Sequence, residues 1–221
     1  MSSVAISGNA SGAGVLTIAA PNTASNFTMT LPAATDTFVG KATTDTLTNK
    51  TLTSPTMTGA VVSTMASSVI TSGTAVASTS GTSKDYTSIP SWVKRITVMF
   101  TSVSLSGTSH FLFQIGTGGT PTTSGYVSSS LGVDTAGSPG VTSTAGFVFY
   151  AGTAATAYNG IYNFVNLTGN TWVNTGMQNG GTRVTTSAGT VALGGVLDNL
   201  RITTVNGTDT FDLGTVNILY E

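Results

Sequence analysis

Hydrophobic and polar residues alternate with a period of two along much of this 221-residue chain. The clearest run places Phe111, Phe113 and Ile115 on one face of an extended segment, and residues 95–100 and 161–165 are further strand candidates. Such segments, bounded by Gly, Ser, Asn and Pro, are typical of strands and turns, and no long window has the 3.6-residue spacing of an amphipathic helix. We therefore predict an all-β fold.

The pattern divides the chain into three regions. Residues 1–41 hold short strand candidates, such as residues 27–31, and predict a small N-terminal β module. A module of this size buries little surface, so we expect it to dock on a partner, such as another protein of a larger particle. Residues 42–84 form a Thr/Ser-rich connector, and residues 85–221 predict a C-terminal β-sandwich that is jelly-roll-like.

The connector contains a small repeat in which Leu47, Leu52 and Met57 each stand between threonines. A single strand of this kind has one thin apolar stripe and nothing to cover it, whereas three copies around an axis would cover one another. We therefore predict a trimeric stalk in which these three residues make the contacts. The alternative is a flexible Ser/Thr linker, which would not need the regular apolar positions.

Two stretches of the C-terminal region are rich in small and polar residues, and we expect them to be loops. Residues 116–146 are dominated by Gly, Thr, Ser and Pro, and residues 169–194 by Gly, Asn and Thr, with a short strand at Trp172. Long connections without a strand pattern are often functional.

Charge is scarce: 7% of the residues are charged and the formal net charge is -1, against about 25% charged in ordinary globular chains. A neutral, Thr-rich monomer would be poorly soluble, so we expect much of the surface to be buried in an oligomer. The absence of Cys excludes disulfides. We expect no membrane span, no signal peptide and no nucleic-acid partner, because long apolar runs, a basic leader and a basic patch are all missing.

Residues suited to catalysis or metal binding are few. His110 is interpreted as a strand-edge or interface histidine, and Asp209 and Asp212 as turn residues in preference to a Ca²⁺ site or a glycosidase pair. The basic pair Lys94 and Arg95 is interpreted as a charged strand edge, although it could meet a neighbouring subunit or an anionic glycan. We expect no cofactor, no metal and no enzymatic activity.

Glycan recognition requires aromatic platforms beside polar groups. Tyr126, Tyr158, Asn159 and Trp172 are the candidates for such a receptor site. The competing interpretation is that the aromatic residues belong to the core, which is the more common place for such rings.

Several segments resemble bacteriophage tail-fibre and related virion proteins. Residues 45–55 (DTLTNKTLTSP) resemble a connector motif of such fibres, and residues 89–100 (IPSWVKRITVMF) and 200–221 resemble the two ends of a phage-fibre C-terminal domain. The resemblance implies a virion protein, homotrimeric as most such fibres are, and concerned with recognition of a host cell-surface glycan or protein.

The leading hypothesis is therefore a homotrimeric tail fibre or spike on the surface of a phage particle, attached to tail or capsid proteins through its N-terminal region. A head fibre or capsid decoration protein without a receptor role is the alternative, favoured by the short chain. A polysaccharide depolymerase is disfavoured by the scarcity of carboxylates.

Overall fold

A computed structural model describes residues 12, 22–26, 51, 53 and 70–221. The chain divides into two compact units, Met1–Thr58 and Gly59–Glu221, and the fold described here is that of the second unit. Most of the expected N-terminal module, as well as the stalk residues Leu47, Leu52 and Met57, lies outside the described residues.

The second unit is all-β, as predicted, and its strands form two antiparallel sheets. The larger sheet has the order β1 (Thr71–Ser72), β14 (Phe211–Tyr220), β4 (Arg95–Leu105), β10 (Tyr158–Thr168), β11 (Thr171–Gly180), β12 (Arg183–Ala192), β7 (Val127–Val133) and β8 (Gly140–Ser143), with β2 (Val76–Ala77) also paired to β14. The smaller sheet has the order β3 (Lys84–Tyr86), β13 (Asn199–Thr204), β5 (Phe111–Thr117) and β6 (Thr120–Pro121), with β9 (Phe147–Phe149) also paired to β5.

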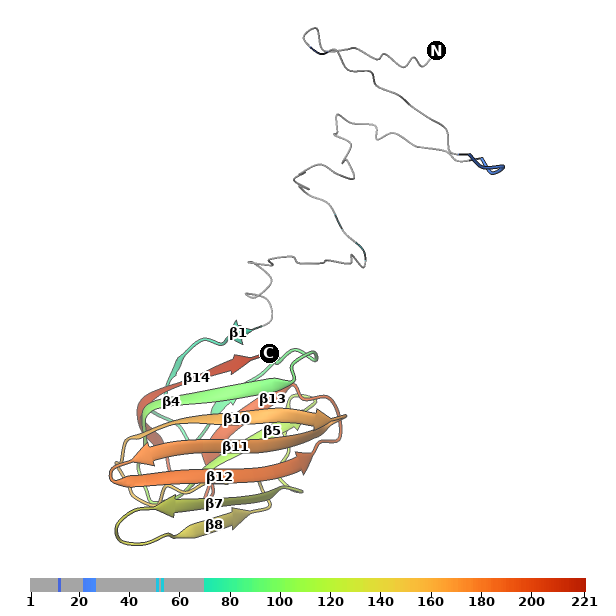
Figure 1. The fold of residues 1–221 in the computed structure, drawn as a ribbon. Helices are drawn as coiled ribbons and strands as arrows, with labels where there is room; N and C mark the ends of the chain where they lie inside the picture. Colours follow the sequence, from blue (N-terminus) through green and yellow to red (C-terminus); the bar gives the residue numbers. More distant parts are fainter. Residues whose placement is uncertain (1–11, 13–21, 27–50, 52, 54–69) are drawn as a thin grey trace. The chain divides into compact units, whose positions relative to one another are not determined.

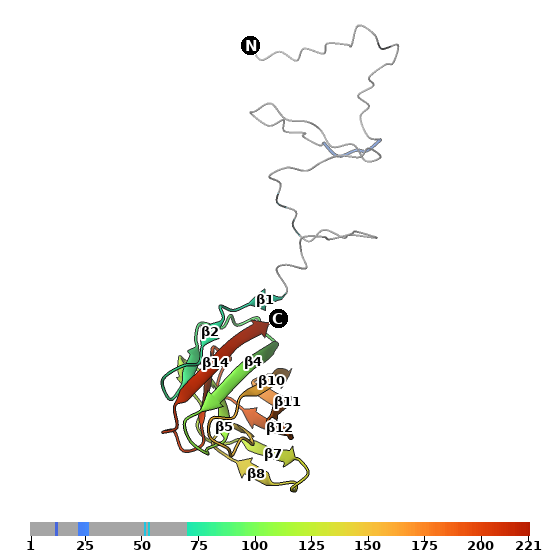
Figure 2. The same cartoon turned by 90° about the vertical axis from the view of Figure 1, so that its left-hand side faces the viewer.

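The two sheets pack as layers. Figure 1 shows the larger sheet in front, with its strands side by side from β1 at one edge to β8 at the other, and β5 and β13 behind it. Figure 2 shows the same strands after a quarter turn, with the larger sheet curving from β14 to β8. Most connections carry the chain from one sheet to the other, and the exceptions are β1–β2, β5–β6, β7–β8 and the meander β10–β11–β12.

The sandwich begins earlier in the chain than expected. Strands β1 and β2 pair with β14, and Lys84 at the start of β3 pairs with Ile202 of β13. These residues lie within the connector predicted over residues 42–84, so the boundary predicted at residue 85 is wrong by more than ten residues. Strands of two or three residues are too short to show alternation, which is why the sequence pattern did not mark them.

The core between the sheets is rich in aromatic residues. The predicted face of Phe111, Phe113 and Ile115 is completely buried. The ring of Phe113 lies 4.7 Å from that of Tyr162, which in turn packs edge-on against Phe149 at 4.4 Å. Aromatic pairs at such separations add about 0.5–1.5 kcal/mol each beyond the burial of their surface. These contacts therefore stabilise the packing of the larger sheet, through Tyr162, against β5 and β9.

One edge of β9 is held by side chains instead of by a neighbouring strand. Ser128 of β7 accepts the backbone N–H of Val148 at 3.0 Å, and Ser187 of β12 donates to the carbonyl of Val148 at 2.7 Å. Ser130 accepts the N–H of Tyr150 at 3.0 Å. The inner faces of β7 and β12 are therefore polar because they satisfy backbone groups of β9 that would otherwise be buried without partners.

No helix among the described residues is long and apolar enough to cross a membrane.

Candidate functional site

Three of the four predicted receptor residues belong to the core. Tyr126, Tyr158 and Trp172 are 1%, 2% and 3% exposed. The ring of Tyr126 packs edge-on against Phe147 at 4.9 Å, and that of Tyr158 against Phe111 at 5.3 Å. The prediction that these rings form a surface platform is wrong, and the competing interpretation of buried aromatics is correct.

Asn159 is the one predicted receptor residue that lies on the surface. Its side-chain oxygen accepts the backbone N–H of Ser102 at 2.9 Å. Ser102 has a positive φ of 54° and sits where β4 and β10 change register. Asn159 therefore supports a local irregularity of the sheet while the residue remains exposed.

The polar residues weighed for chemistry are occupied in structural contacts. Asp209 accepts the backbone N–H of Ser109 at 2.8 Å, which joins two neighbouring turns, and Asp212 pairs with the hydroxyl of Ser104. Arg95 forms an ion pair with Glu221, the last residue of the chain. Within the described part of the chain, no three His, Asp or Glu side chains gather closely enough to hold a metal ion.

A second polar cluster surrounds the single histidine. The ring of His110 packs against that of Tyr150 with 4.6 Å between the ring centres. The guanidinium of Arg183 lies over the Tyr150 ring, 4.8 Å from its centre. Arg183 also pairs with Asp134 at 2.6 Å. The pKa of Asp134 is lowered by the backbone N–H of Ala136 and by Arg183, so this carboxylate is a fixed anion that positions the guanidinium.

The largest departure from an ordinary sandwich is the polarity of β7. Its inward positions are Ser128, Ser130 and Gly132, whereas its outward positions include Val127, Leu131 and Val133. An antiparallel sheet with one solvent-facing side normally shows the opposite pattern, with apolar residues inward and polar residues outward. The outward side of β7 is therefore unusually apolar for a solvent-facing strand.

The same outward side continues over β10, β11 and β12, and we call the outward positions of β7, β10, β11 and β12 the outer face. Cross-strand pairing aligns Ile161 with Met177, Met177 with Thr186, and Thr186 with Leu131, which makes one continuous row across the four strands. Seven large hydrophobic residues of the outer face are between 37% and 71% exposed; they are Val127, Leu131, Val133, Ile161, Val165, Met177 and Val184.

The outer face carries no charge. Among the outward positions of these four strands, all of which lie within residues 127–192 of the described chain, the side chains are aliphatic, Ser, Thr, Ala or Asn. Exposed apolar surface that spans several strands marks an interaction site in a soluble protein. A charge-free surface selects a neutral partner, because a charged partner would lose water without gaining an ion pair.

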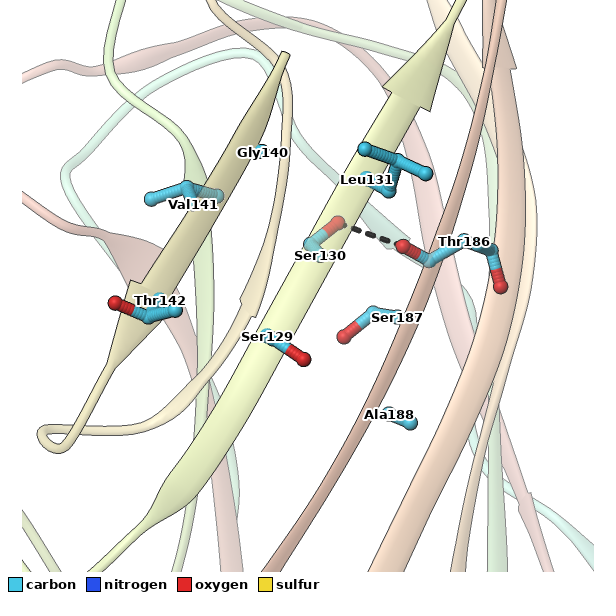
Figure 3. Close-up of a pocket in the computed structure, with 9 residues that line it drawn as sticks. All are labelled: Ser129, Ser130, Leu131, Gly140, Val141, Thr142, Thr186, Ser187 and Ala188. Carbon is cyan, nitrogen blue, oxygen red and sulfur yellow. Dashed lines mark hydrogen bonds between the residues drawn. The ribbon is translucent and has the colours of Figure 1, made fainter. Parts of the chain in front are cut away.

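A shallow hollow opens in the outer face at the β8 edge (Figure 3). Its volume is about 450 Å³, and its lining combines the apolar Leu131 and Val141 with the hydroxyls of Ser129, Thr142 and Thr186. The hydroxyl of Ser130 is already engaged, since it donates to the carbonyl of Thr186 at 2.8 Å. No residue of this lining titrates near neutral pH, so the hollow offers shape, apolar contact and neutral hydrogen bonds.

The sequence reasoning missed an exposed tryptophan that packs beside a partly buried tyrosine. Trp92 is 48% exposed, and its ring lies 5.9 Å from that of Tyr220. A hollow of about 260 Å³ beside Tyr220 is also lined by Tyr86 and Asp85. The signal was present in the sequence, because Trp92 follows Pro90 and Ser91 ahead of the strand at Arg95, in a position where a turn would expose it.

A comparison of the chain with protein-family models, with curated proteins and with solved structures finds no match.

Proposed function

We propose that this chain is a bacteriophage virion structural protein, the subunit of a homotrimeric tail fibre or spike that mediates attachment to the host surface. The observation that carries the proposal is the outer face, which is apolar, uncharged and turned away from the core of its own subunit. A face of this kind is suited to permanent contact with other protein surface, as the interfaces of obligate oligomers are.

The resemblance of residues 45–55, 89–100 and 200–221 to phage-fibre segments supports the same proposal. In this proposal the N-terminal region attaches to tail or capsid proteins, and the Thr-rich connector forms a stalk in which Leu47, Leu52 and Met57 of three copies meet. The sandwich, jelly-roll-like in its alternation between sheets, is the head. Three heads would give avidity to weak individual contacts with a host glycan or protein.

Within this proposal, Trp92 and Tyr220 replace the buried rings as the aromatic platform for a host glycan. Trp92 is exposed and Tyr220 is partly buried, and Asp85 and Tyr86 line a hollow beside Tyr220. Stacking of a sugar ring on an exposed aromatic face and hydrogen bonds from neighbouring polar groups are the usual elements of such recognition.

The direct test is cryo-electron microscopy of the intact particle, in which the chain is located and its copies are counted. Threefold density that projects from the tail is the expected result. Density on the capsid would instead establish the alternative, a head fibre or capsid decoration protein, and the role in host attachment would then be withdrawn. Density with a symmetry other than threefold would exclude the homotrimer.

A further inference from the structure

The hollow beside Tyr220 lies between three segments that are distant in the sequence. Its walls come from residues 73–76, from residues 85–89, and from Ile218 and Tyr220 of β14. Figure 2 shows β1 and β2, which flank the first of these segments, lying along β14. The hollow has a volume of about 260 Å³, which is below the roughly 300–1,000 Å³ of pockets for drug-sized ligands. Its size therefore suits one small ring and not a longer chain.

The walls of the hollow are held in place by hydrogen bonds. The N–H of Gly73 donates to the carbonyl of Ile218 at 2.8 Å, and the hydroxyl of Tyr86 donates to the carbonyl of Val216 at 3.0 Å. A Cβ on residue 73 would lie 2.9 Å from the side chain of Ile218, so this close approach requires glycine. A hollow with fixed walls loses little conformational entropy when a ligand enters it.

Ser88, which lines the hollow, has a strained backbone. Its φ is 59°, a value that residues other than glycine rarely adopt. The next residue, Ile89, is buried and donates its N–H to the carbonyl of Asp198 at 2.9 Å, which holds Ser88 in this conformation. Strain of this kind is concentrated at ligand sites and other functional positions. Ser88 and Thr87 are both exposed, so their hydroxyls can reach a ligand in the hollow.

The charge at the hollow is balanced. Asp85 is the carboxylate of the lining, and the guanidinium of Arg201 donates to its two oxygens at 2.6 Å and 3.3 Å. A carboxylate has about four acceptor positions, so Asp85 can still accept hydrogen bonds from a ligand. Because the two charges compensate each other, the site does not attract an anion. The remaining polar side chains of the lining are neutral hydroxyls, those of Thr74, Tyr86, Thr87, Ser88 and Tyr220.

Trp92 extends the site beyond the hollow. Tyr220 forms part of the wall, and the centre of the exposed Trp92 ring lies 5.9 Å from the centre of the Tyr220 ring. A ligand with two linked rings can therefore place one ring in the hollow and the other against the indole. The face of an indole is apolar and pairs with the apolar face of such a ring.

We propose, on the basis of the host-attachment function proposed for this chain, that the hollow and Trp92 are two neighbouring subsites for a neutral oligosaccharide. One sugar unit occupies the hollow, where its hydroxyls donate to the carboxylate of Asp85 and bond with Thr87 and Ser88. The next unit lies with its apolar face on Trp92. An acidic saccharide is disfavoured, because Asp85 lines the hollow and already engages the guanidinium of Arg201.

Saturation-transfer NMR of the full-length chain tests the proposal with maltose, lactose and cellobiose as neutral probes. We expect at least one of these disaccharides to bind, and its single hexose units to bind about tenfold more weakly because each fills one subsite. Sialyllactose is the matched acidic probe and should bind no better than lactose. Preference for sialyllactose would overturn the neutral ligand class, and no binding of any neutral probe would overturn the site.

Variants of the two subsites locate the binding. Trp92→Ala should weaken it about tenfold, whereas Trp92→Phe should retain most of it because an aromatic ring remains. Asp85→Asn should weaken it several-fold, since an ionised acceptor is replaced by a neutral one. Asp212→Asn is the matched control, because Asp212 is an exposed carboxylate at the opposite end of β14 from Tyr220. Circular dichroism should show all four variants folded, and unchanged affinity of Trp92→Ala would overturn the proposal.

The outcome can be separated from that of the proposed function, because the binding measurement uses the isolated chain. Threefold density on the tail together with no saccharide binding would overturn the two subsites and leave the tail fibre standing. Saccharide binding by a chain that is located on the capsid would support the subsites and overturn the attachment role at the tail.

Discussion

The hydroxyl of Tyr126 satisfies both backbone groups of Ile115. It accepts the N–H of Ile115 at 3.0 Å and donates to the carbonyl of the same residue at 3.0 Å. Burial raises the pKa of Tyr126 well above its usual range, so the hydroxyl keeps its proton and can serve as donor and acceptor together. A side chain thus supplies hydrogen bonds along this edge of β5, beside the backbone N–H of Thr122 that donates to the same carbonyl.

We predict that Tyr126→Phe destabilises the protein by about 1–3 kcal/mol, because the buried N–H of Ile115 loses its partner while the ring stays in place. The carbonyl of Ile115 keeps the N–H of Thr122 at 3.1 Å. Chemical denaturation measures the change, at one fixed subunit concentration since the stability of an oligomer depends on concentration. Tyr220→Phe, whose ring is only partly buried, is the control and should change stability little. Equal stability of Tyr126→Phe and the unaltered protein would show that water replaces the hydroxyl.

Two adjacent serines of β7 should behave differently. Ser128 accepts the buried N–H of Val148, whereas Ser129 points outward and is exposed. We expect Ser128→Ala to lower the free energy of unfolding by about 1–3 kcal/mol and Ser129→Ala to change it by less than about 0.5 kcal/mol. Denaturation of the two variants side by side checks the prediction, and similar losses in both would contradict the orientation of β7.

Gly176 gives room to an aromatic ring. A Cβ at this position would lie 2.9 Å from the ring of Phe149 and 2.9 Å from the carbonyl oxygen of Ile161. Gly176→Ala should therefore destabilise the protein by about 1–3 kcal/mol through overpacking. Gly194→Ala is the matched control, because nothing lies within 4 Å of the added methyl. Thermal unfolding of the two variants distinguishes a steric effect from a general effect of replacing glycine.

The stability should depend on pH through His110. Its Nδ1 accepts the backbone N–H of Ala151 at 3.1 Å, which requires an unprotonated Nδ1, and burial lowers its pKa below 6.5. Because the folded state lowers this pKa, the stability it contributes is complete above the unfolded value and is lost as the pH falls below about 6.5.

The variant His110→Asn isolates this contribution. The asparagine oxygen can still accept the N–H of Ala151, but it does not titrate in this range. Unfolding free energies measured between pH 5 and pH 8 should fall more steeply toward low pH for the unaltered protein than for His110→Asn. Parallel curves would mean that His110 does not contribute to the acid response.

The sequence predicted the strands whose apolar residues face the core, and it missed those whose pattern is reversed. Phe111, Phe113 and Ile115 mark β5 because their burial follows the usual alternation. Strands β7 and β12 lie in the two stretches expected as loops, because most of their inward positions are Ser, Thr and Gly. These small and polar residues are needed because they make room for the rings of β9 and hydrogen-bond to its backbone. Because these contacts join residues that are distant in sequence, no local pattern could indicate them.

The candidate site was missed for a related reason. From a single sequence, an aromatic residue with polar neighbours in the chain is interpreted as a surface platform. In the structure, Tyr126 packs against Phe147, and Trp172 is the cross-strand partner of Val191. Only the pairing of the strands brings these residues together in the core. The outer face could be identified only once the register of β7, β10, β11 and β12 was known. The composition predicts that part of the surface is buried in an oligomer, and this stays a prediction.

The buried serines of β7 and β12 that hydrogen-bond to the segment of β9 also affect how the stability of the protein changes on cooling. Exposure of polar surface lowers the heat capacity of unfolding, whereas exposure of apolar surface raises it. Because Ser128, Ser130 and Ser187 occupy interior positions that other sandwiches fill with aliphatic side chains, unfolding should have a smaller heat-capacity increment than is usual for this length. The stability curve is then broader, and the subunit retains its fold over a wider span of temperature on the cold side of its optimum.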